Sequence, residues 1–329
     1  MKENTTESQK MKKQILLHLG AEGGEVTLTS TMVNDTRTYQ VNVSEIFDVD
    51  DKSNSFSTQA LAWKYLQKQY KSWQMLYPLA ISAEIRPLVQ KAFDFNNSNE
   101  NVQNYWKYHL SLCPFTLKSM PDIVDYINNN SDAIINKLEH ESFETYLFIT
   151  ENYKSNITEN YLFQFVFRSY YRLDGGGLSP EIKRTFFELF EQYKQVDLSH
   201  YWSQPLSEIV ERLYQIPSLK SQNTVQFSFA TKLLNTLNNR IPIYDSEVKM
   251  VFGFADAYST DYKKRVERLL SYHQVISDTY SIINRDNLLG LTLDKLDSKF
   301  PMYTHIPEIK KLDFVFWAAG KLMRSTSKN

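Results

Sequence analysis

The hydrophobic pattern of this 329-residue chain changes its period once, and that change is the strongest constraint on its fold. Residues 13–45 contain three short runs in which apolar and polar residues alternate, separated by Gly23-Gly24 and Asn34-Asp35. Alternation is typical of half-buried strands, and such residue pairs are typical of tight turns. After residue 98 the apolar spacing is helical to the C-terminus. The sequence therefore predicts an α+β fold, with its strands in the N-terminal part.

We expect residues 1–97 to form a small α/β unit of about three strands and two helices. The predicted strands cover residues 14–19, 25–29 and 38–43, and the predicted helices cover residues 59–72 and 83–93. Residues 48–57 are polar and acidic, and they predict a loop. The polar segment 95–101 has no apolar periodicity and predicts a linker, so residues 98–329 are expected to form a mainly α-helical domain.

Composition excludes several classes of protein. A single cysteine rules out a disulfide within the chain and a cysteine-ligated iron–sulfur cluster. No Cys/His cluster has metal-ligand spacing, so no metal or redox cofactor is predicted. The N-terminus is polar and no apolar run approaches the ~20 residues that span a bilayer, which predicts a cytoplasmic protein without a membrane partner. The net charge of −1 argues against a strongly basic nucleic-acid binder, although a local basic patch would suffice.

Residues 227–249 carry the pattern that most suggests chemistry. Lys232 lies among apolar residues at helical spacing, and Asp245 begins a second helix after a short polar turn. A desolvated lysine can act as a nucleophile, and an aspartate in the same crevice can stabilise a cationic intermediate or accept protons. Taken singly, such residues are more often a solvated lysine and a helix cap.

This segment resembles the active-site core of the helix-hairpin-helix DNA glycosylases, and is closest to their 8-oxoguanine glycosylase-like branch. The resemblance rests on Ala230-Thr231-Lys232 and on Ile241-Pro242-Ile243-Tyr244-Asp245-Ser246. It implies that Lys232 is the amine, that Asp245 is the acidic partner, and that the target nucleotide flips out of the stack. The family hairpin usually carries glycines before the lysine, whereas residues 221–231 contain none, and Glu247 stands where the family often has histidine.

A second resemblance concerns residues 311–321, where Asp313 and Trp317 are four residues apart and share a helix face. The archaeal branch of the 8-oxoguanine glycosylases has a similar Asp-x-x-x-Trp pair that binds the flipped base. An indole ring stacks on a base, and a carboxylate accepts hydrogen bonds from ring N–H groups. The alternative is a core tryptophan with an aspartate near the start of a helix.

The segment 163–178 is predicted to be a buried helix that ends at three consecutive glycines. By resemblance to the family it would line the base pocket and contact DNA, with Arg168, Tyr171 and Arg172 as the candidates. An ordinary helix cap followed by a loop is the alternative. The same resemblance adds further candidates: Phe229 for the base pocket and Gln226, Ser228 and Lys249 for DNA binding. Residues 215–272 carry eight basic and five acidic side chains, a mild local excess of positive charge.

Together these patterns predict a DNA glycosylase with AP-lyase activity that excises a damaged or modified base from duplex or single-stranded DNA. The resemblance favours an oxidised purine and leaves hypermodified bases of phage DNA open. One alternative is a catalytically inactive nucleic-acid-binding or sensing protein on the same scaffold, with a role in phage defence. Another is a protein-interaction module in the N-terminal unit, which resembles a small bacterial domain of unknown function through residues 18–24 and 73–79.

Overall fold

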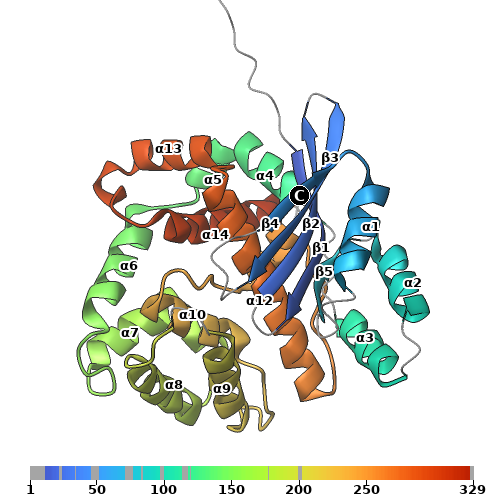
Figure 1. Ribbon diagram of the computed structural model, residues 1–329. Coiled ribbons are helices and arrows are strands. Elements are labelled where there is room, and N and C mark those ends of the chain that lie inside the picture. The colour runs from blue at the N-terminus through green and yellow to red at the C-terminus, as the bar shows by residue number, and fades with distance from the viewer. Residues whose placement is uncertain are drawn as a thin grey trace, which may run out of the picture. The chain divides into compact units, whose positions relative to one another are not determined.

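The computed structural model describes residues 12–21, 24–33, 35–45, 52–70, 77–82, 84–96, 100–112, 118, 120–176, 178–198 and 202–326 (Figure 1). The chain forms two compact units, of which the first contains Met1–Asp125 and Phe252–Asp256. The second contains Tyr126–Val251 and Ala257–Asn329. The strands of the described residues all lie in the first unit and the second is helical, so the predicted α+β fold is confirmed.

The first unit is built on a five-stranded antiparallel sheet with the order β4-β3-β2-β1-β5. Its strands are β1 (Lys12–Ala21), β2 (Gly24–Val33), β3 (Thr36–Glu45), β4 (Lys52–Phe56) and β5 (Tyr77–Ile81). The three predicted strands correspond to β1, β2 and β3 and are confirmed. Strands β2 and β3 pair in continuous register, from Gly24 opposite Glu45 to Val33 opposite Thr36.

Two edge strands add to the three predicted ones, and each shows why pattern alone missed it. The predicted loop over 48–57 is wrong where it covers β4. The side chains of β4 do not alternate between polar and apolar, so the pattern gives no sign of a strand. An edge strand can still form, because it is held by backbone hydrogen bonds to its one neighbour. Ser53 accepts a hydrogen bond from Gln40 (2.6 Å) and donates one to Asn42 (2.9 Å). Strand β5 contains Pro78, which lacks an N–H and is tolerated at an edge, and its register with β1 shifts beside that residue.

Three helices complete the core of the first unit: α1 (Gln59–Tyr70), α2 (Arg86–Asn96) and α3 (Glu100–Leu112). Helices α1 and α2 agree with the two predicted ones. Helix α3 places Trp106 and Leu110 in the same apolar core as Leu16, Leu19 and Val41 of the sheet. The first unit therefore extends past residue 97, where the sequence places the domain boundary. Helix α4 (Met120–Asn129) spans the boundary between the units along the chain.

The second unit consists of helices with short connections. They are α5 (Ser131–Ile135), α6 (His140–Asn152), α7 (Tyr161–Tyr170), α8 (Pro180–Tyr193), α9 (Ser203–Tyr214), α10 (Phe227–Leu237), α11 (Ser246–Phe252), α12 (Tyr262–Arg285), α13 (Gly290–Lys299) and α14 (Glu308–Thr326), with 3-10 turns at Leu173–Gly176 and Pro301–Tyr303. Polar residues cap several of them: Ser179 accepts from Ile182 N (3.3 Å) ahead of Pro180.

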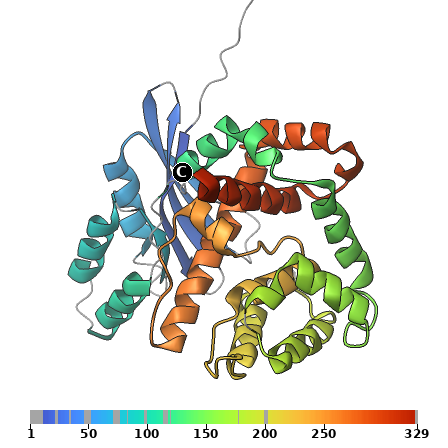
Figure 2. The same ribbon diagram turned by 180° about the vertical axis from the view of Figure 1, so that it is seen from behind.

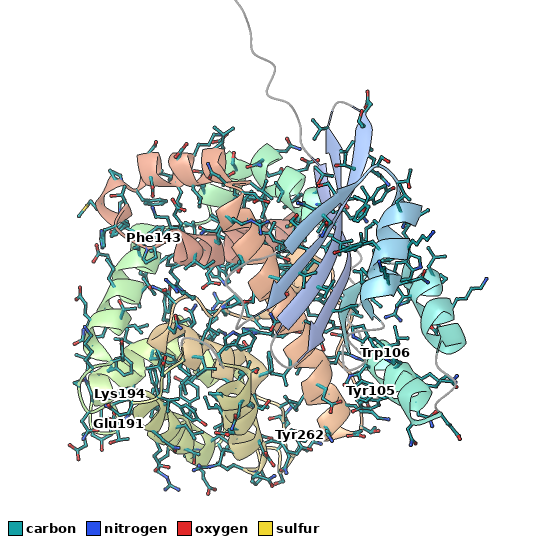
Figure 3. All side chains as sticks on the ribbon, in the orientation of Figure 1. Tyr105, Trp106, Phe143, Glu191, Lys194 and Tyr262 are labelled. Carbon is teal, nitrogen blue, oxygen red and sulfur yellow. The ribbon has the colours of Figure 1, made fainter. Side chains whose placement is uncertain are left out.

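Within the second unit, α7 to α10 form one group of helices and α5, α13 and α14 form another, with α6 running between them (Figures 1 and 2). Phe143 of α6 joins the second group, because its ring contacts Phe300, Tyr303 and Phe314 (Figure 3). Lys232 lies on α10, Asp245 immediately precedes α11, and Asp313 and Trp317 lie on α14.

Some predicted features lie outside the described residues. They include Gly23, Asn34, Trp73 and Gly177, residues 97–99 of the predicted 95–101 linker, and residues 48–51 of the predicted loop. The other residues of the predicted linker are wrongly placed in a linker, because they belong to α2 and α3. No helix among the described residues is both long and apolar enough to cross a membrane.

Candidate active site

Lys232 is a buried amine in the middle of α10. Its side chain is only 8% exposed, although ammonium groups normally remain in water. Nζ donates a hydrogen bond to the hydroxyl of Ser228, one helical turn earlier, at 3.1 Å. The rings of Tyr171 and Phe229 lie 5.8 and 5.5 Å from Nζ. The amine is thus surrounded by aromatic rings, with a neutral hydroxyl as its hydrogen-bond acceptor.

The environment of Lys232 favours its neutral form. Burial lowers the pKa of Lys232, and this effect outweighs the nearby negative charge of Asp245, which raises it. The positive charge of Arg172 lowers the pKa further. A lysine must lose its proton before it can attack an electrophile, so a lowered pKa increases the fraction of the amine that is able to do so.

Asp245 caps α11 and still has one uncommitted oxygen. Its Oδ1 accepts hydrogen bonds from the backbone N–H groups of Glu247 (2.9 Å) and Val248 (3.0 Å), as an N-cap aspartate does. Among the described residues, Oδ2 accepts no hydrogen bond, and the half-buried carboxylate makes no direct ion pair with Lys232. The cap orients Asp245 while Oδ2 remains available to a bound group.

The segment 241–244, which leads to Asp245, is held by buried side chains from three helices. Its hydrogen bonds are Asn235 to the Ile241 carbonyl (2.7 Å), the His273 ring to the Pro242 carbonyl (2.7 Å), the Ile243 N–H to Asp313 Oδ1 (3.2 Å) and the Tyr244 N–H to the Thr231 hydroxyl (3.2 Å). Because a carbonyl only accepts, the proton of the His273 ring is on Nε2. The backbone that delivers Asp245 is therefore fixed at successive residues.

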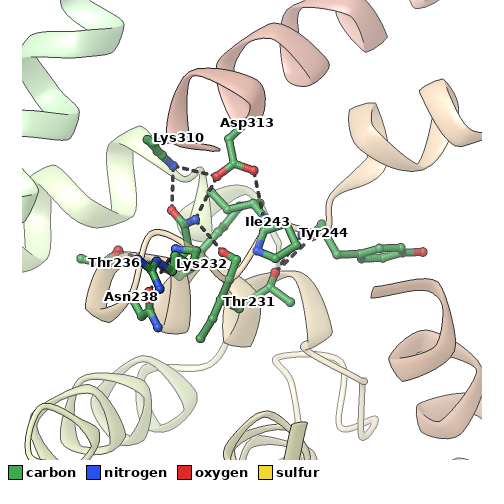
Figure 4. Close-up of polar contacts among 12 residues, drawn as sticks. Thr231, Lys232, Thr236, Asn238, Ile243, Tyr244, Lys310 and Asp313 are labelled. Atoms are coloured by element: carbon green, nitrogen blue, oxygen red, sulfur yellow. Dashed lines mark hydrogen bonds and ion pairs between the residues drawn. The ribbon is translucent and has the colours of Figure 1, made fainter. Parts of the chain in front are cut away.

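Asp313 belongs to the network that holds this segment. The carboxylate is 5% exposed, and its Oδ2 accepts from Asn235 (2.9 Å) and from the Lys310 ammonium (3.2 Å). Lys310 also donates to Asn235 Oδ1 at 2.6 Å (Figure 4). Burial raises the pKa of Asp313 and lowers that of Lys310, while the charge of each opposes the shift of the other. Protein donors occupy both carboxylate oxygens, so Asp313 acts in this geometry as a structural anchor.

Trp317 lies one turn after Asp313 on α14, as the spacing predicts, and is half-buried. The ammonium of Lys321 lies 3.7 Å from the centre of the indole ring, a close cation–π contact. Burial lowers the pKa of Lys321, and the charge of Arg172 lowers it further. The charge of Arg172 therefore lowers the pKa of both Lys321 and Lys232.

The α7 candidates lie in three different environments. Tyr171 is buried, and desolvation raises the pKa of its hydroxyl. Arg168 is half-buried, and its Nε lies 3.7 Å from the carboxylate of Asp174, which also binds Lys183 at 2.6 Å. Arg172 is exposed and has a left-handed backbone, with a φ of 55°. Helix α7 ends at Tyr170, and Arg172 takes the left-handed position after it, before the glycines that were predicted to end the helix.

The other predicted DNA-binding residues are close to α10 and α11. Gln226 immediately precedes α10, is 8% exposed, and bonds the hydroxyl of Thr224. Ser228 is half-buried and accepts the hydrogen bond from Lys232. Lys249 is half-buried near the end of α11. Of these residues, the structure connects only Ser228 directly to the amine.

Sequence reasoning missed Asn235, His273, Lys310 and Lys321. The signal for Asn235 and Lys310 is a polar residue at an apolar position of a helix, which has to find a buried partner. Lys321 follows Trp317 by four residues, a spacing that places it on the same face. His273 carries no comparable signal, because its partner, the Pro242 carbonyl, is 31 residues away in sequence.

Comparison with known proteins adds no assignment: no family model, no curated protein and no solved structure matches this chain. Among the described residues, no group of three or more His, Cys, Asp or Glu side chains is arranged to hold a metal ion. The functional case rests on the chemistry of the residues around Lys232.

Proposed function

We propose that this protein is a DNA glycosylase with AP-lyase activity, in which Lys232 is the nucleophile. The observation that carries the proposal is the state of the Lys232 amine, which is buried among aromatic rings, has a lowered pKa and donates only to a hydroxyl among the described residues. An isolated buried charge is costly and needs a compensating role. Perturbed lysines of this kind are frequent in enzymes that form Schiff bases.

The proposed reaction assigns one task to each of the two groups. The neutral Lys232 amine forms a bond to the sugar C1′ as the glycosidic bond breaks, and the departing base takes the bonding electron pair and then a proton. Asp245 stabilises the positive charge that develops on the sugar, and its uncommitted Oδ2 is the oxygen that would face it. Loss of the amine proton and opening of the sugar ring then produce a Schiff base, from which β-elimination releases the 3′-phosphate.

The substrate follows from the surroundings of the amine. The rings of Tyr171 and Phe229, which lie near Lys232, and of Trp317, which lies against Lys321 on α14, would be the stacking surfaces for a flipped base. Arg172 and Lys321 place positive charge where the phosphates that flank a flipped nucleotide would lie. We therefore propose a nucleotide with a damaged or modified base as the substrate, and an oxidised purine as the first one to test. We also propose a cytoplasmic location, because the proposed substrate is DNA.

Borohydride trapping tests the amine directly. The purified full-length protein is incubated with oligonucleotides that carry 8-oxoguanine or other modified bases, and sodium borohydride reduces any Schiff base to a stable covalent adduct. We expect an adduct with the wild-type protein and with Lys264→Gln, which changes an exposed lysine of α12. We expect none with Lys232→Gln, and a strongly reduced yield with Asp245→Asn, which keeps the helix cap.

Each outcome has a distinct meaning. An adduct that persists in Lys232→Gln would refute Lys232 as the nucleophile. Base release without an adduct would support a monofunctional glycosylase that depends on Asp245. Neither release nor an adduct on any substrate, combined with tight binding, would favour the non-catalytic nucleic-acid sensor and would remove the enzymatic proposal.

A further inference from the structure

Helix α7 exposes a cluster of large apolar side chains. Tyr161 is 77% exposed, Leu162 is 64% exposed and Phe165 is 59% exposed. Elsewhere among the described residues, exposed large apolar side chains occur singly along the chain. Single exposed residues need no explanation, but a contiguous apolar patch is a sign of a binding surface.

The same face of the helix continues into Arg168, and Arg172 follows just after the helix ends. Residues 161, 165 and 168 are four and three residues apart, so they lie in one row along α7, which ends at Tyr170. The opposite face holds Phe163 and Phe167, which are fully buried. We call the row of Tyr161, Phe165 and Arg168, together with Arg172 after the helix end, the α7 ridge. Its first half is aromatic and its second half is cationic.

The ridge is held rigidly at its N-terminal end. Asn160 caps α7 by accepting a hydrogen bond from Phe163 N (3.0 Å). The preceding loop is tied to α8, because Glu191 accepts from Ile157 N (2.8 Å) and Lys194 donates to the Ser155 carbonyl (2.7 Å) (Figure 3). The two rings are therefore presented to solvent on a fixed support, which lowers the entropy that a partner must overcome.

The cationic end of the ridge adjoins the candidate active site, because Arg172 directly follows Tyr171, whose ring centre lies 5.8 Å from Lys232 Nζ. Arg172 makes no ion pair with any described residue, and its charge lowers the pKa of Lys232 and of Lys321. Asp174 is closer to Lys183 than to Arg168, so it only partly offsets the arginine charge. Positive charge without a matching carboxylate indicates an anionic partner at this end.

We propose that the α7 ridge binds unpaired nucleotides on one side of the nucleotide that enters the Lys232 site. Bases stack on Tyr161 and Phe165, and phosphates lie against Arg168 and Arg172. The two rings are about 6 Å apart along the helix axis, which suits neighbouring nucleotides of an extended strand. This inference deepens the proposed function, since it names single-stranded or locally unpaired nucleic acid as the preferred form of the substrate.

Two further features agree with an unpaired strand. In a paired duplex the base faces are covered by their neighbours, so exposed rings on a helix surface would find nothing to stack on. Residues 221–231, which lead into and begin α10, contain no glycine, and glycine at such a place lets the backbone approach a phosphate closely. The exposed rings of the α7 ridge therefore suit separated bases better than a duplex.

Fluorescence anisotropy of the full-length protein tests the ridge. The probes are a labelled 20-mer of mixed sequence, the duplex of the same sequence, and that duplex with a central unpaired bubble. We expect the single strand and the bubble to bind at least roughly tenfold more tightly than the duplex. Replacing both rings by leucine, in Tyr161→Leu with Phe165→Leu, is expected to weaken single-strand binding by roughly tenfold or more for each ring.

Two matched variants separate stacking from general apolar contact. Tyr161→Phe with Phe165→Tyr keeps both rings and should retain single-strand affinity, whereas the leucine pair keeps the apolar surface and should lose it. Tyr258→Ala removes a tyrosine that is equally exposed, at 76%, in the loop before α12, and should leave the affinity unchanged. Sedimentation of every variant shows whether the patch instead joins two copies of the chain.

The inference is overturned if the duplex binds as tightly as the single strand, if the leucine pair binds normally, or if no probe binds. It is also overturned if the wild-type protein dimerises through the ridge and the leucine pair retains nucleic-acid binding. The proposed chemistry fails separately: a protein that binds single strands through the ridge but yields no borohydride adduct would keep this inference and lose the glycosylase.

Discussion

The described part of the second unit buries three lysines, and the surroundings of two of them, Lys232 and Lys310, differ in one decisive respect. Lys310, only 2% exposed, donates to the Asp313 carboxylate and to the Asn235 amide, and its hydrogen bonds form a closed network. Lys232 is 8% exposed and donates to the hydroxyl of Ser228, with no carboxylate in direct contact. Both amines are desolvated, and burial lowers the pKa of both.

The difference separates structure from chemistry. A buried charge with a complete set of partners stabilises one arrangement of its neighbours and has nothing left to offer a ligand. A buried amine with an incomplete set costs stability, and such a cost is typical of sites that act on a substrate. The two lysines are linked through α10, since Asn235 lies less than one turn after Lys232 on that helix. The satisfied network thereby holds the helix that carries the unsatisfied amine.

The largest predicted effect on stability comes from replacing Lys310 by methionine, and the same replacement at Lys232 provides the contrast. Lys310→Met leaves the Asp313 carboxylate buried without its cation, so we expect the free energy of unfolding to fall by about 3–5 kcal/mol. Lys232→Met leaves no carboxylate unpaired and puts an apolar group among aromatic rings, so we expect unchanged or increased stability. Urea unfolding followed by far-ultraviolet circular dichroism measures both at pH 7.

The difference in stability between the wild type and Lys232→Met should depend on pH, and its sign follows from the pKa shift of Lys232. Because the Lys232 pKa is lower in the folded state, the unfolded chain binds more protons below pH 10.5, and charging this lysine opposes folding at neutral pH. Any gain in Lys232→Met should therefore diminish as the pH rises toward 10.5. Equal losses of stability in both methionine variants would contradict the contrast between the two lysines.

Acid should destabilise the fold at His273, whose ring holds the Pro242 carbonyl in the segment that leads to Asp245. Burial lowers the pKa of His273 to about 4 from 6.5, and its hydrogen bond to the Pro242 carbonyl only partly offsets this effect. The folded state therefore keeps the ring neutral after the unfolded chain has taken up a proton. The stabilisation is complete above pH 6.5 and is lost as the pH falls to about 4, a loss of about 3 kcal/mol in the free energy of unfolding.

Unfolding by urea at a series of pH values between 4 and 8 tests this expectation. His273→Gln is the matched variant, because its amide can still donate to the Pro242 carbonyl but does not titrate in this range. Its stability should change much less than that of the wild type over the same interval. An identical pH profile in the variant would assign the acid sensitivity to other groups.

What the sequence could predict here follows from local rules. Helix and strand periods come from burial along a single element, so α10, α11 and β1 to β3 were expected where they occur. The placement of Lys232 inside a helix and of Asp245 at a helix start needs only neighbouring residues. The identity of the chemistry came from resemblance, and it remains a prediction.

The remaining features depend on partners that are distant in the chain. Asp313 was expected to read a base, yet its partner Asn235 lies 78 positions away and Ile243 lies 70 away. No local pattern indicates which of several buried polar groups will meet after the helices pack. Edge strand β4 was missed for a related reason, since its position is set by pairing with β3.

A smaller effect concerns how closely α11 approaches α14. A Cβ placed on Gly320 would collide with the backbone of Glu247, two residues after Asp245. We expect Gly320→Ala to lower the free energy of unfolding by about 1–3 kcal/mol, because neither helix backbone can yield freely. The displaced α11 should also reduce adduct formation in the borohydride assay while the Lys310 network stays intact. Gly290→Ala is the comparison, because the atoms it would meet belong to the side chain of Asn287.

The smallest predicted change in stability is at Arg172, which follows Tyr171 near the Lys232 amine. Its φ of 55° is a conformation that suits glycine, and relieving it should raise the free energy of unfolding by about 1 kcal/mol in Arg172→Gly. The same variant removes a charge from beside Lys232 and should weaken single-strand binding, with the slope of log affinity against log salt falling by about 0.7. Arg184→Gln, which alters an exposed arginine of α8, should change neither quantity.

A variant more stable than the wild type but weaker in binding would show that this end of α7 is shaped for a ligand at the expense of the fold. Loss of stability in Arg172→Gly would instead mean that Arg172 supports the fold, and the contrast between the two sides of the unit would then have to be abandoned.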